Sequence, residues 1–395
     1  MSSSNSTALF SSPLFPPFLD PKSWYPSPYR TTSPRPWFLP VTLCSFIFSS
    51  LLPRKTRLWI ATPALLLLIS QARVSSTGDV AKDFGRGTLL FGWLLKWIDY
   101  GMLVKDGELW KVGDRRGQKK DGDRDEKGRR KKEVETGVWQ RFKGIVELWM
   151  FNMRGIGWNW EVGGIPDQAP QSKSYAPPSH LTHPQLTTTS YFLFRTALRV
   201  LGSYIILDLT KFLSSQIPYI HLSPRPSFFA LPVATQVLLT WLHQLEAFTF
   251  INIPYQLTSF LLVLTSIHPP ESWPPLFGSL SDAYLVSRAW GRTWHQVLRR
   301  PLGLLTSHAQ HWLGVKARGA KRSVSLACSF FLSGLLHWSG CLNLPWTESA
   351  AGMFWYFIMQ APVIRLEDYA VEFGGKRGIS SSRKFCSNEE MEGWH

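Results

Sequence analysis

The stretch SVSLACSFFLSGLLHWSG, residues Ser323 to Gly340, decides the fold, because it is apolar, helix-forming and carries the imidazole of His337. A titratable ring inside a membrane helix is costly to bury and marks a candidate functional position. Small or polar side chains recur here every four residues, at Ser329, Ser333, His337 and Cys341. On a helix they form one narrow stripe. Two interpretations stay open: room for a substrate beside the ring, or close helix packing in which the histidine bonds a neighbouring helix.

The composition favours one polytopic membrane domain over two soluble domains. Of 395 residues, 44% are hydrophobic, 14% are aromatic and only 18% are charged. The net charge of +16 lies largely in connecting segments, where Lys and Arg hold cytoplasmic loops on the inner side of a membrane. No recognisable nucleic-acid-binding fold accompanies that charge, so no nucleic-acid partner is predicted. The four cysteines are scattered, which predicts neither a disulfide framework nor a zinc site.

The first part of the chain changes character at Trp37. Residues 1–36 are rich in Ser and Pro and predict a disordered tail rather than a cleaved signal peptide. Residues 37–370 are the predicted membrane-embedded domain. Trp37 to Pro53 and Leu58 to Ile69 are apolar runs that predict a helical hairpin, with the basic residues between them in the cytosol.

Charged and amphipathic segments come next. Gly87 to Val104 is an apolar run interrupted by Lys96 and Asp99. Residues 105–137 are dense in alternating charge and predict a solvated cytosolic loop. Val138 to Trp160 predicts an amphipathic helix at the membrane interface. A Pro- and Ser-rich loop follows, up to His183.

The second half of the chain contains the remaining apolar runs. The predicted apolar helices are Thr188–Leu213, Phe228–Phe250, Ile251–Ile267 with Pro254 breaking its start, Ser323–Gly340 and Gly352–Ile364. Between them, Leu285–Arg300 predicts a short amphipathic helix, and Pro301–Leu313 predicts a re-entrant or interfacial segment. The fold class is therefore all-α and polytopic, with roughly seven to nine embedded helices. Asp99 and Asp208, which lie inside apolar runs, are predicted to pair with arginines.

Several ordered motifs carry a resemblance to a known family. The segment PPESWPPLFGSLSDAYLVSRAWGRTWHQVLRR, residues 269–300, is called the signature segment below, and it opens the core motif region 269–345. With SGLLHW around His337, FIMQAPVIRLED at 357–368 and RGIGW at 154–158, it resembles the wax synthase-like branch of the membrane-bound O-acyltransferases, of the fungal acetyltransferase and wax synthase domain type. The matching positions in the signature segment are Trp290, Gly291, Trp294, His295, Gln296 and Arg299. Ala289 departs from the family, which usually has Phe there.

The resemblance implies a membrane enzyme with a buried reaction chamber. It implies acyl-CoA or acetyl-CoA as the co-substrate, an alcohol as the acceptor and no permanently bound cofactor. The acceptor is a long-chain alcohol or a hydroxyl of a terpenoid or polyketide metabolite. His337 is then the general base, since imidazole has a pKa near the operating pH. Ser333, one turn away, lies where it would orient the ring or serve a structural role.

The signature segment supplies the other candidate site residues. As a helix it would place Trp290 and Trp294 on an apolar face, and Arg292, His295, Gln296 and Arg299 around the other face. An interfacial helix without catalytic duty has the same pattern. The functional interpretation is that His295 and Gln296 polarise the thioester carbonyl, while Arg292, Arg299 and Arg300 meet CoA phosphates. Positive-inside anchoring is the alternative for the arginines.

Two further features bear on function. His308 and His311 lie three residues apart but have no third ligand nearby, so no metal is expected. After Asp368 the family usually continues through more apolar helices, whereas residues 371–395 are polar and glycine-rich. This tail is expected to be truncated or mis-spliced, which leaves a catalytically degenerate membrane scaffold as the alternative function. The expected location is a multi-pass position in the endoplasmic reticulum membrane.

Overall fold

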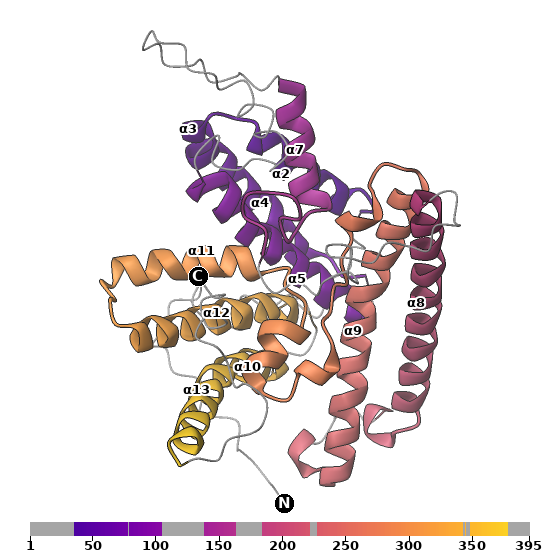
Figure 1. Cartoon of the computed structure of the whole chain (residues 1–395), viewed down its shortest axis with the longest axis vertical. Helices are drawn as coiled ribbons and strands as arrows, with labels where there is room; N and C mark the ends of the chain where they lie inside the picture. Colours follow the sequence, from indigo (N-terminus) through magenta and orange to yellow (C-terminus); the bar gives the residue numbers. More distant parts are fainter. Residues whose placement is uncertain are drawn as a thin grey trace, which may run out of the picture. The chain divides into compact units, whose positions relative to one another are not determined.

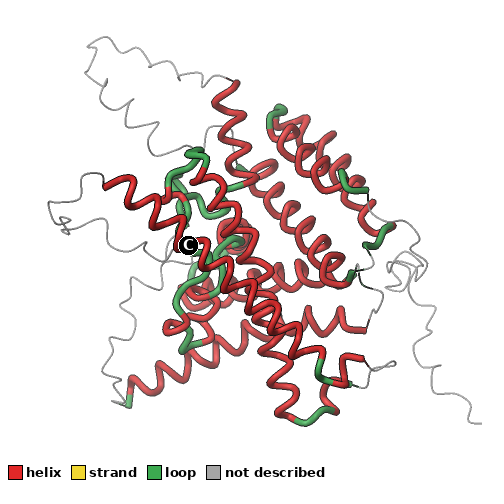
Figure 2. Tube along the Cα trace, turned by 90° about the vertical axis from the view of Figure 1, so that its right-hand side faces the viewer, coloured by secondary structure: helices red, strands yellow, loops and turns green. Residues whose placement is uncertain are grey.

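The computed structural model describes residues 35–77, 79–104, 138–162, 184–221, 227–342, 344 and 348–377. These residues form helices and loops, and none of them lies in a β-strand (Figure 2). The chain divides into two compact units. The first unit comprises Met1–Gly164, Ala283–Gly291 and Gln296–His395, and the second comprises Ile165–Asp282 and Arg292–His295. The all-α class is thereby confirmed for the described residues.

The first unit contains most of the described helices. Its N-terminal elements are α2 (Phe38–Ser50), α3 (Arg54–Thr56), η1 (Arg57–Ala61), α4 (Thr62–Ser70), η2 (Gln71–Val74), α5 (Val80–Lys96), η3 (Trp97–Leu103) and α7 (Val138–Met150). Its C-terminal elements are α10 (Val286–Arg288), α11 (Arg299–Trp312), α12 (Arg318–Cys341) and α13 (Glu348–Lys376). The short helix η8 (Ala289–Thr293) follows α10 directly.

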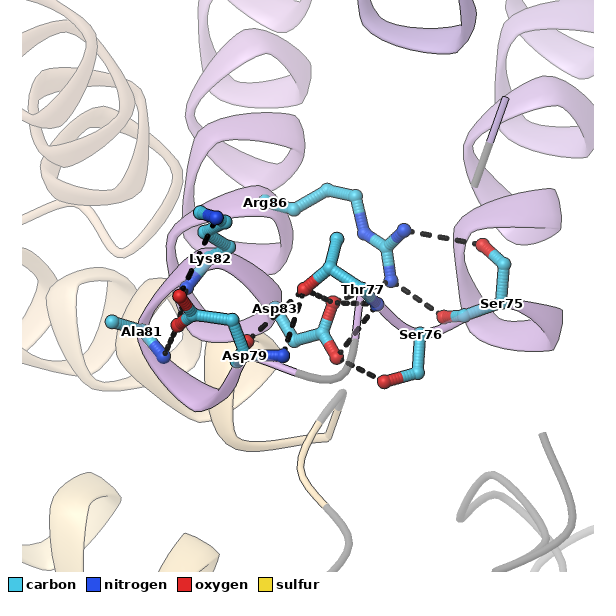
Figure 3. A network of polar contacts seen from close by, with 8 residues as sticks. All are labelled: Ser75, Ser76, Thr77, Asp79, Ala81, Lys82, Asp83 and Arg86. Atoms are coloured by element: carbon cyan, nitrogen blue, oxygen red, sulfur yellow. Dashed lines mark hydrogen bonds and ion pairs between the residues drawn. The ribbon is translucent and has the colours of Figure 1, made fainter. Parts of the chain in front are cut away.

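Polar side chains fix the start of α5 (Figure 3). Asp79 is the N-cap and accepts hydrogen bonds from the backbone N–H groups of Ala81 (2.9 Å) and Lys82 (3.1 Å). The bond from Lys82 lowers the pKa of the Asp79 carboxyl, so this cap stays ionised at neutral pH. One turn later, the buried Asp83 and Arg86 form an ion pair of 3.2 Å, and Arg86 donates to the Ser75 carbonyl (2.6 Å). This cap explains why α5 begins seven residues before the predicted Gly87.

Aromatic rings form the core between α2, α5 and α7. Phe46 stacks on Trp149, with ring centroids 5.0 Å apart, and contacts Trp93 and Trp97. The Trp149 indole also donates to the Ser50 hydroxyl (3.1 Å). The predicted hairpin of two N-terminal helices is confirmed, and its second helix is continuous through α3, η1 and α4.

Helix α12 is the central helix of the first unit and packs against α5, α11 and α13 (Figure 1). The approach to α5 is closest at Gly340, where an added Cβ would lie 2.5 Å from Thr88 Oγ1 and 2.8 Å from the Phe84 carbonyl oxygen. The Ser339 hydroxyl also donates to the Gly87 carbonyl of α5 (3.2 Å). At Gly334 an added Cβ would lie 3.0 Å from the Phe354 ring of α13. Small residues therefore set the helix spacing around His337.

The second unit is built on two long antiparallel helices that lie side by side, α8 (Pro184–Ser215) and α9 (Val233–Leu264) (Figure 1). Short helices flank α9: η4 (Pro218–His221), η5 (Phe228–Ala230), η6 (Pro270–Ser272) and η7 (Leu280–Asp282). Asn252 donates to the Ser203 hydroxyl across the pair (3.2 Å), and Gln256 donates to Asn252 (3.4 Å). These three side chains are buried, whereas large apolar side chains such as Phe194 and Trp241 are exposed.

Two helices of the described residues, α9 and α12, are long and apolar enough to cross a membrane. This result includes the helix of His337. The larger number of roughly seven to nine embedded helices stays a prediction.

Three further predicted boundaries, beside the start of α5, are wrong. Phe228–Phe250 and Ile251–Ile267 are not two helices, because α9 is continuous through Pro254. Proline removes one helix hydrogen bond, and neighbouring groups in membrane helices can compensate for that loss. Helix α7 ends at Met150 rather than Trp160, since Gly155 (φ 69°) and Gly157 (φ 74°) adopt left-handed conformations. Helix α13 extends to Lys376, well beyond the predicted Ile364.

Other predictions lie wholly or mostly outside the described residues. These are the N-terminal tail 1–36, the charged loop 105–137, the Pro- and Ser-rich loop up to His183 and most of the tail 371–395.

The close contact at Gly340 yields a test of the fold. We expect Gly340→Ala to destabilise the protein by about 1–3 kcal/mol, because the methyl group would push α5 and α12 apart. Gly319→Ala on the same helix is the control, since no atom lies within 4 Å of its Cβ position. Thermal unfolding of both variants in detergent measures the difference. Equal midpoints would show that the contact carries no strain.

Candidate functional site

His337 lies on α12, between α5 and α13. Its Nδ1 lies 2.8 Å from the Ser333 carbonyl oxygen, one turn earlier. The imidazole stacks on the Phe357 ring of α13, with centroids 4.1 Å apart and an interplanar angle of 18°. The Phe84 ring of α5 lies 6.4 Å away at 39°. Three helices therefore surround the imidazole.

The contact with Ser333 determines which ring nitrogen can act as a base. A carbonyl oxygen only accepts hydrogen bonds, so Nδ1 of His337 carries the proton and donates. In the neutral ring the lone pair is then on Nε2. None of the residues that the structure describes forms a hydrogen bond with Nε2. Ser333 binds the imidazole through its backbone carbonyl, and its hydroxyl does not orient Nδ1.

The signature segment does not form the predicted continuous helix from Leu285 to Arg300. It consists of α10, η8 and a turn at residues 294–298, before α11 begins at Arg299. Two contacts account for the break. The Gln296 side-chain amide donates to the Trp290 carbonyl (3.1 Å), and the Thr293 carbonyl accepts from the Gly278 N–H (2.9 Å). Both carbonyls are thus bound outside a helical ladder, and the two predicted helix faces do not exist.

Trp290 packs into the first unit beside the histidine helix. Its indole N–H donates to the Gln360 side-chain oxygen (3.1 Å), and its ring contacts Phe330 and Phe357. Val286, Leu326 and Ile364 complete this apolar cluster. Because Phe357 also stacks on His337, Trp290 contacts a direct neighbour of the imidazole.

Two adjacent acidic residues near the end of α13, Glu367 and Asp368, form the acidic pair, and each bonds to a different helix. The Glu367 carboxylate accepts hydrogen bonds from the backbone N–H groups of Val286 (2.7 Å) and Ser287 (2.9 Å), at the start of α10. Asp368 forms a bidentate pair with Arg322 of α12, at 2.7 Å for both bonds, and also contacts Arg365 (3.0 Å). The acidic pair thus joins α13 to both α10 and α12.

His295 and its aromatic neighbours belong to the second unit. The His295 ring lies 5.8 Å from Phe277 at 81° and 5.5 Å from Trp294. Phe277 in turn contacts Phe248 of α9, with centroids 4.5 Å apart. The WPPLFG turn is further held by Tyr255, whose hydroxyl donates to the Pro274 carbonyl (2.6 Å). These contacts place His295 on the turn that packs against α9.

Gly278 is the residue that lets the turn approach the 292–293 backbone. A Cβ at this position would collide with the Arg292 carbonyl oxygen and lie 3.1 Å from its carbonyl carbon. The Gly278 N–H bond to Thr293 is possible only at this separation. The glycine of the WPPLFG motif therefore has a steric reason.

The three arginines predicted to meet CoA phosphates occupy different surroundings. Arg300 forms a bidentate pair with Asp99 (2.8 and 3.0 Å), which is 1% exposed, and lies 4.5 Å from the Trp160 ring centroid. The predicted pairing of Asp99 with an arginine is confirmed. Arg300 is thereby engaged within the protein, while Arg292 and Arg299 are partly buried. Asp208 is exposed and forms no ion pair with a described residue, so its predicted pairing is not found.

Sequence reasoning missed Phe357 and Phe84 as neighbours of His337. Neither has a spacing signal, because each comes from a different helix and is apolar in an apolar run. Among the described residues, no group of three or more His, Cys, Asp or Glu side chains could hold a metal ion.

Comparison with known families identifies one match. Residues 273–359 match the model of the Membrane bound O-acyl transferase family. This range contains the WPPLFG turn, the other signature positions and His337. No solved structure matches the chain.

Comparison with known proteins extends the similarity beyond that range. The acetyltransferase ple2 of Rhodocybe pseudopiperita is 30% identical over 344 residues, which cover 84% of this chain and 79% of the relative. The acetyltransferase eriL of Hericium erinaceus is 26% identical and covers 85% and 82%. The O-Mevalon transferase yanI of Aspergillus niger is 33% identical, covering 59% of this chain and 53% of the relative. The chain thus spans about half the length of yanI.

The Glu367 contacts yield a local test. We expect Glu367→Gln to accelerate amide hydrogen exchange in residues 286–293 by roughly tenfold, because charge-assisted bonds to two backbone N–H groups are lost. Glu372→Gln on the same helix is the control, since Glu372 is exposed and pairs only with Lys376 (2.7 Å). Exchange followed by mass spectrometry measures the effect. Unchanged exchange in both variants would contradict the capping role.

Proposed function

Because the chain belongs to the membrane-bound O-acyltransferase family, we propose that it transfers an acyl group from a CoA thioester to the hydroxyl of an alcohol. The observation that carries the proposal is the environment of His337 inside the matched range. Its Nδ1 is held by a backbone carbonyl, and its Nε2 has the lone pair that a general base needs.

The reaction needs one base and no covalent enzyme intermediate. His337 Nε2 accepts the hydroxyl proton while the alcohol oxygen attacks the thioester carbonyl carbon. The tetrahedral intermediate collapses, the carbon–sulfur bond breaks, and the proton passes from the imidazolium to the departing thiolate. The products are an ester and free CoA. General base catalysis of this kind contributes about 10²- to 10⁴-fold to the rate.

For the acyl group we propose acetyl, and for the acceptor a hydroxyl of a secondary metabolite. Two of the three relatives described above are named acetyltransferases, and their similarity covers most of this chain. Long-chain acyl transfer to a fatty alcohol, which gives a wax ester, is the alternative outcome. A panel of acetyl-CoA and long-chain acyl-CoA donors against terpenoid and fatty alcohols decides between them.

The signature segment supplies the residues that we propose to assist the base. His295 would polarise the thioester carbonyl, beside Trp294 on the same turn. Arg292 and Arg299 would meet the CoA phosphates, for which guanidinium groups have matching geometry. Arg300 is not proposed to bind CoA, because its guanidinium pairs with Asp99. Gln296 and Trp290 would support the site through their contacts with the backbone and with Phe357.

We further propose a multi-pass position in the endoplasmic reticulum membrane. Helix α8 has 32 residues and a length of about 48 Å, more than the roughly 30 Å of a bilayer core. Large apolar side chains cover its exposed side, including Leu198, Leu201, Ile205 and Leu209. Buried polar groups face α9 instead. Apolar residues outside and polar residues inside are the arrangement that lipid favours, so α8 would be an embedded helix beside α9.

A catalytically degenerate scaffold is the competing function. It would bind the membrane through the same helices but would transfer no acyl group. Purified protein in lipid nanodiscs, incubated with the donor and acceptor panel, discriminates between the two functions.

The base assignment yields the first activity prediction. We expect His337→Ala to lower kcat by about 100-fold or more, because the proton acceptor is lost. Ser333→Ala should leave kcat close to that of the unchanged protein, since only the Ser333 carbonyl contacts the imidazole. Steady-state kinetics with acetyl-CoA measure both values. Full activity of His337→Ala would refute the assignment.

The second activity prediction concerns His295. His295→Phe keeps a ring that can pack against Phe277 but removes both nitrogens. If His295 polarises the carbonyl, kcat should fall by about 100-fold. His308→Phe on the exposed side of α11 is the control and should change nothing. Equal kcat values for the two variants would assign His295 to packing alone.

A further inference from the structure

The stack between His337 and Phe357 distinguishes this histidine from the other helical histidines. His243 and His308 also place Nδ1 2.8 and 2.9 Å from the carbonyl oxygen one turn earlier. Such a bond is therefore shared by helical histidines here, and a second contact distinguishes His337. Neither of those rings stacks on an aromatic ring of the described residues, whereas His337 lies 4.1 Å from Phe357 and nearly parallel to it.

Phe357 is itself held in place from several sides. It is 6% exposed and belongs to the apolar cluster with Leu326, Phe330 and Ile364. The Trp290 ring lies 5.7 Å from it and is fixed by the indole bond to Gln360. Glu367 in turn caps the segment that carries Trp290. The ring under the imidazole thus has a defined position.

A ring fixed at one atom can still pivot. The χ2 torsion of histidine is broad, so the hydrogen bond from Nδ1 fixes a point of the ring but not its plane. A parallel aromatic surface fixes the plane, and such contacts contribute beyond the area that they bury. Together the two contacts determine where Nε2 points.

We propose that Phe357 is a positioning residue that holds the plane of the His337 imidazole, so that Nε2 is presented to the acceptor hydroxyl. The proposal rests on the acyl transfer function proposed above. Phe357 acts through His337 and does not itself contact the reacting atoms. A catalytic group that is displaced by about 1 Å can lose around 100-fold in rate, so the orientation of this ring affects kcat rather than substrate affinity.

The decisive variant is Phe357→Leu, which keeps an apolar side chain but removes the flat ring. Phe330→Leu is the matched control, because Phe330 is as deeply buried in the same cluster and contacts Trp290 but not His337. Phe357→Tyr retains the ring and serves as the conservative rescue. Each variant is compared by thermal unfolding, and by kcat and KM for both donor and acceptor.

We expect Phe357→Leu to lower kcat roughly two- to tenfold, the range that an aromatic stack contributes, with both KM values unchanged. Phe357→Tyr should recover most of the lost rate. Phe330→Leu should lower the unfolding midpoint about as much as Phe357→Leu while leaving kcat intact. Equal losses of kcat in Phe330→Leu and Phe357→Leu, or no recovery in Phe357→Tyr, would overturn the proposal.

A second measurement does not depend on acyl transfer. Diethyl pyrocarbonate acylates neutral imidazole, and mass spectrometry measures its rate at His337. Phe357→Leu should increase this rate roughly two- to tenfold, because one face of the ring is uncovered, while Phe330→Leu should not. Equal labelling rates would overturn the proposal. Absence of acyl transfer by the unchanged protein would instead refute the proposed function, and the labelling would still test the stack.

Discussion

The close approach of α12 to its two neighbours is the constraint on which the candidate site depends. Gly340 lies against Phe84 and Thr88 of α5, and Gly334 lies against Phe354 of α13. His337 is three residues from each glycine. On an α-helix, side chains three residues apart point in directions that differ by about 60°. The imidazole therefore points between the direction of α13 and the direction of α5. This geometry explains why it contacts Phe357 on one helix and Phe84 on the other.

The signature segment is largely explained by contacts with its own chain. Gly278 allows a backbone hydrogen bond to Thr293, and the Gln296 amide binds the Trp290 carbonyl. Trp290 then packs against Phe357. The acidic pair lies on α13, as Phe357 does, and completes this arrangement. Glu367 caps α10, while Asp368 binds Arg322 of α12. Several motif positions thus have a structural reason, beside the chemistry proposed for the two histidines.

Apolar periodicity and charge placement predicted the helices but not their breaks or contacts. The His337 helix and the pairing of Asp99 with an arginine followed from the sequence, since a long apolar run and a buried carboxylate each have few physical solutions. Pro254 led to an incorrect break, because tertiary packing can retain a helix despite one lost hydrogen bond. The break after η8 depends on contacts with distant Gly278, and the Phe357 stack depends on a separate helix. Neither has a local signal.

The buried charges of the first unit differ from His337 in how they are satisfied. Lys96 donates to the carbonyls of Leu148 (2.8 Å) and Trp149 (3.1 Å), which ties α5 to the end of α7. Asp99 is bound by Arg300, which ties η3 to the start of α11. Removing one partner of such a pair leaves a desolvated charge, so these groups stabilise the fold around the site. The His337 ring is fixed through Nδ1 and one face, and Nε2 forms no hydrogen bond with a described residue.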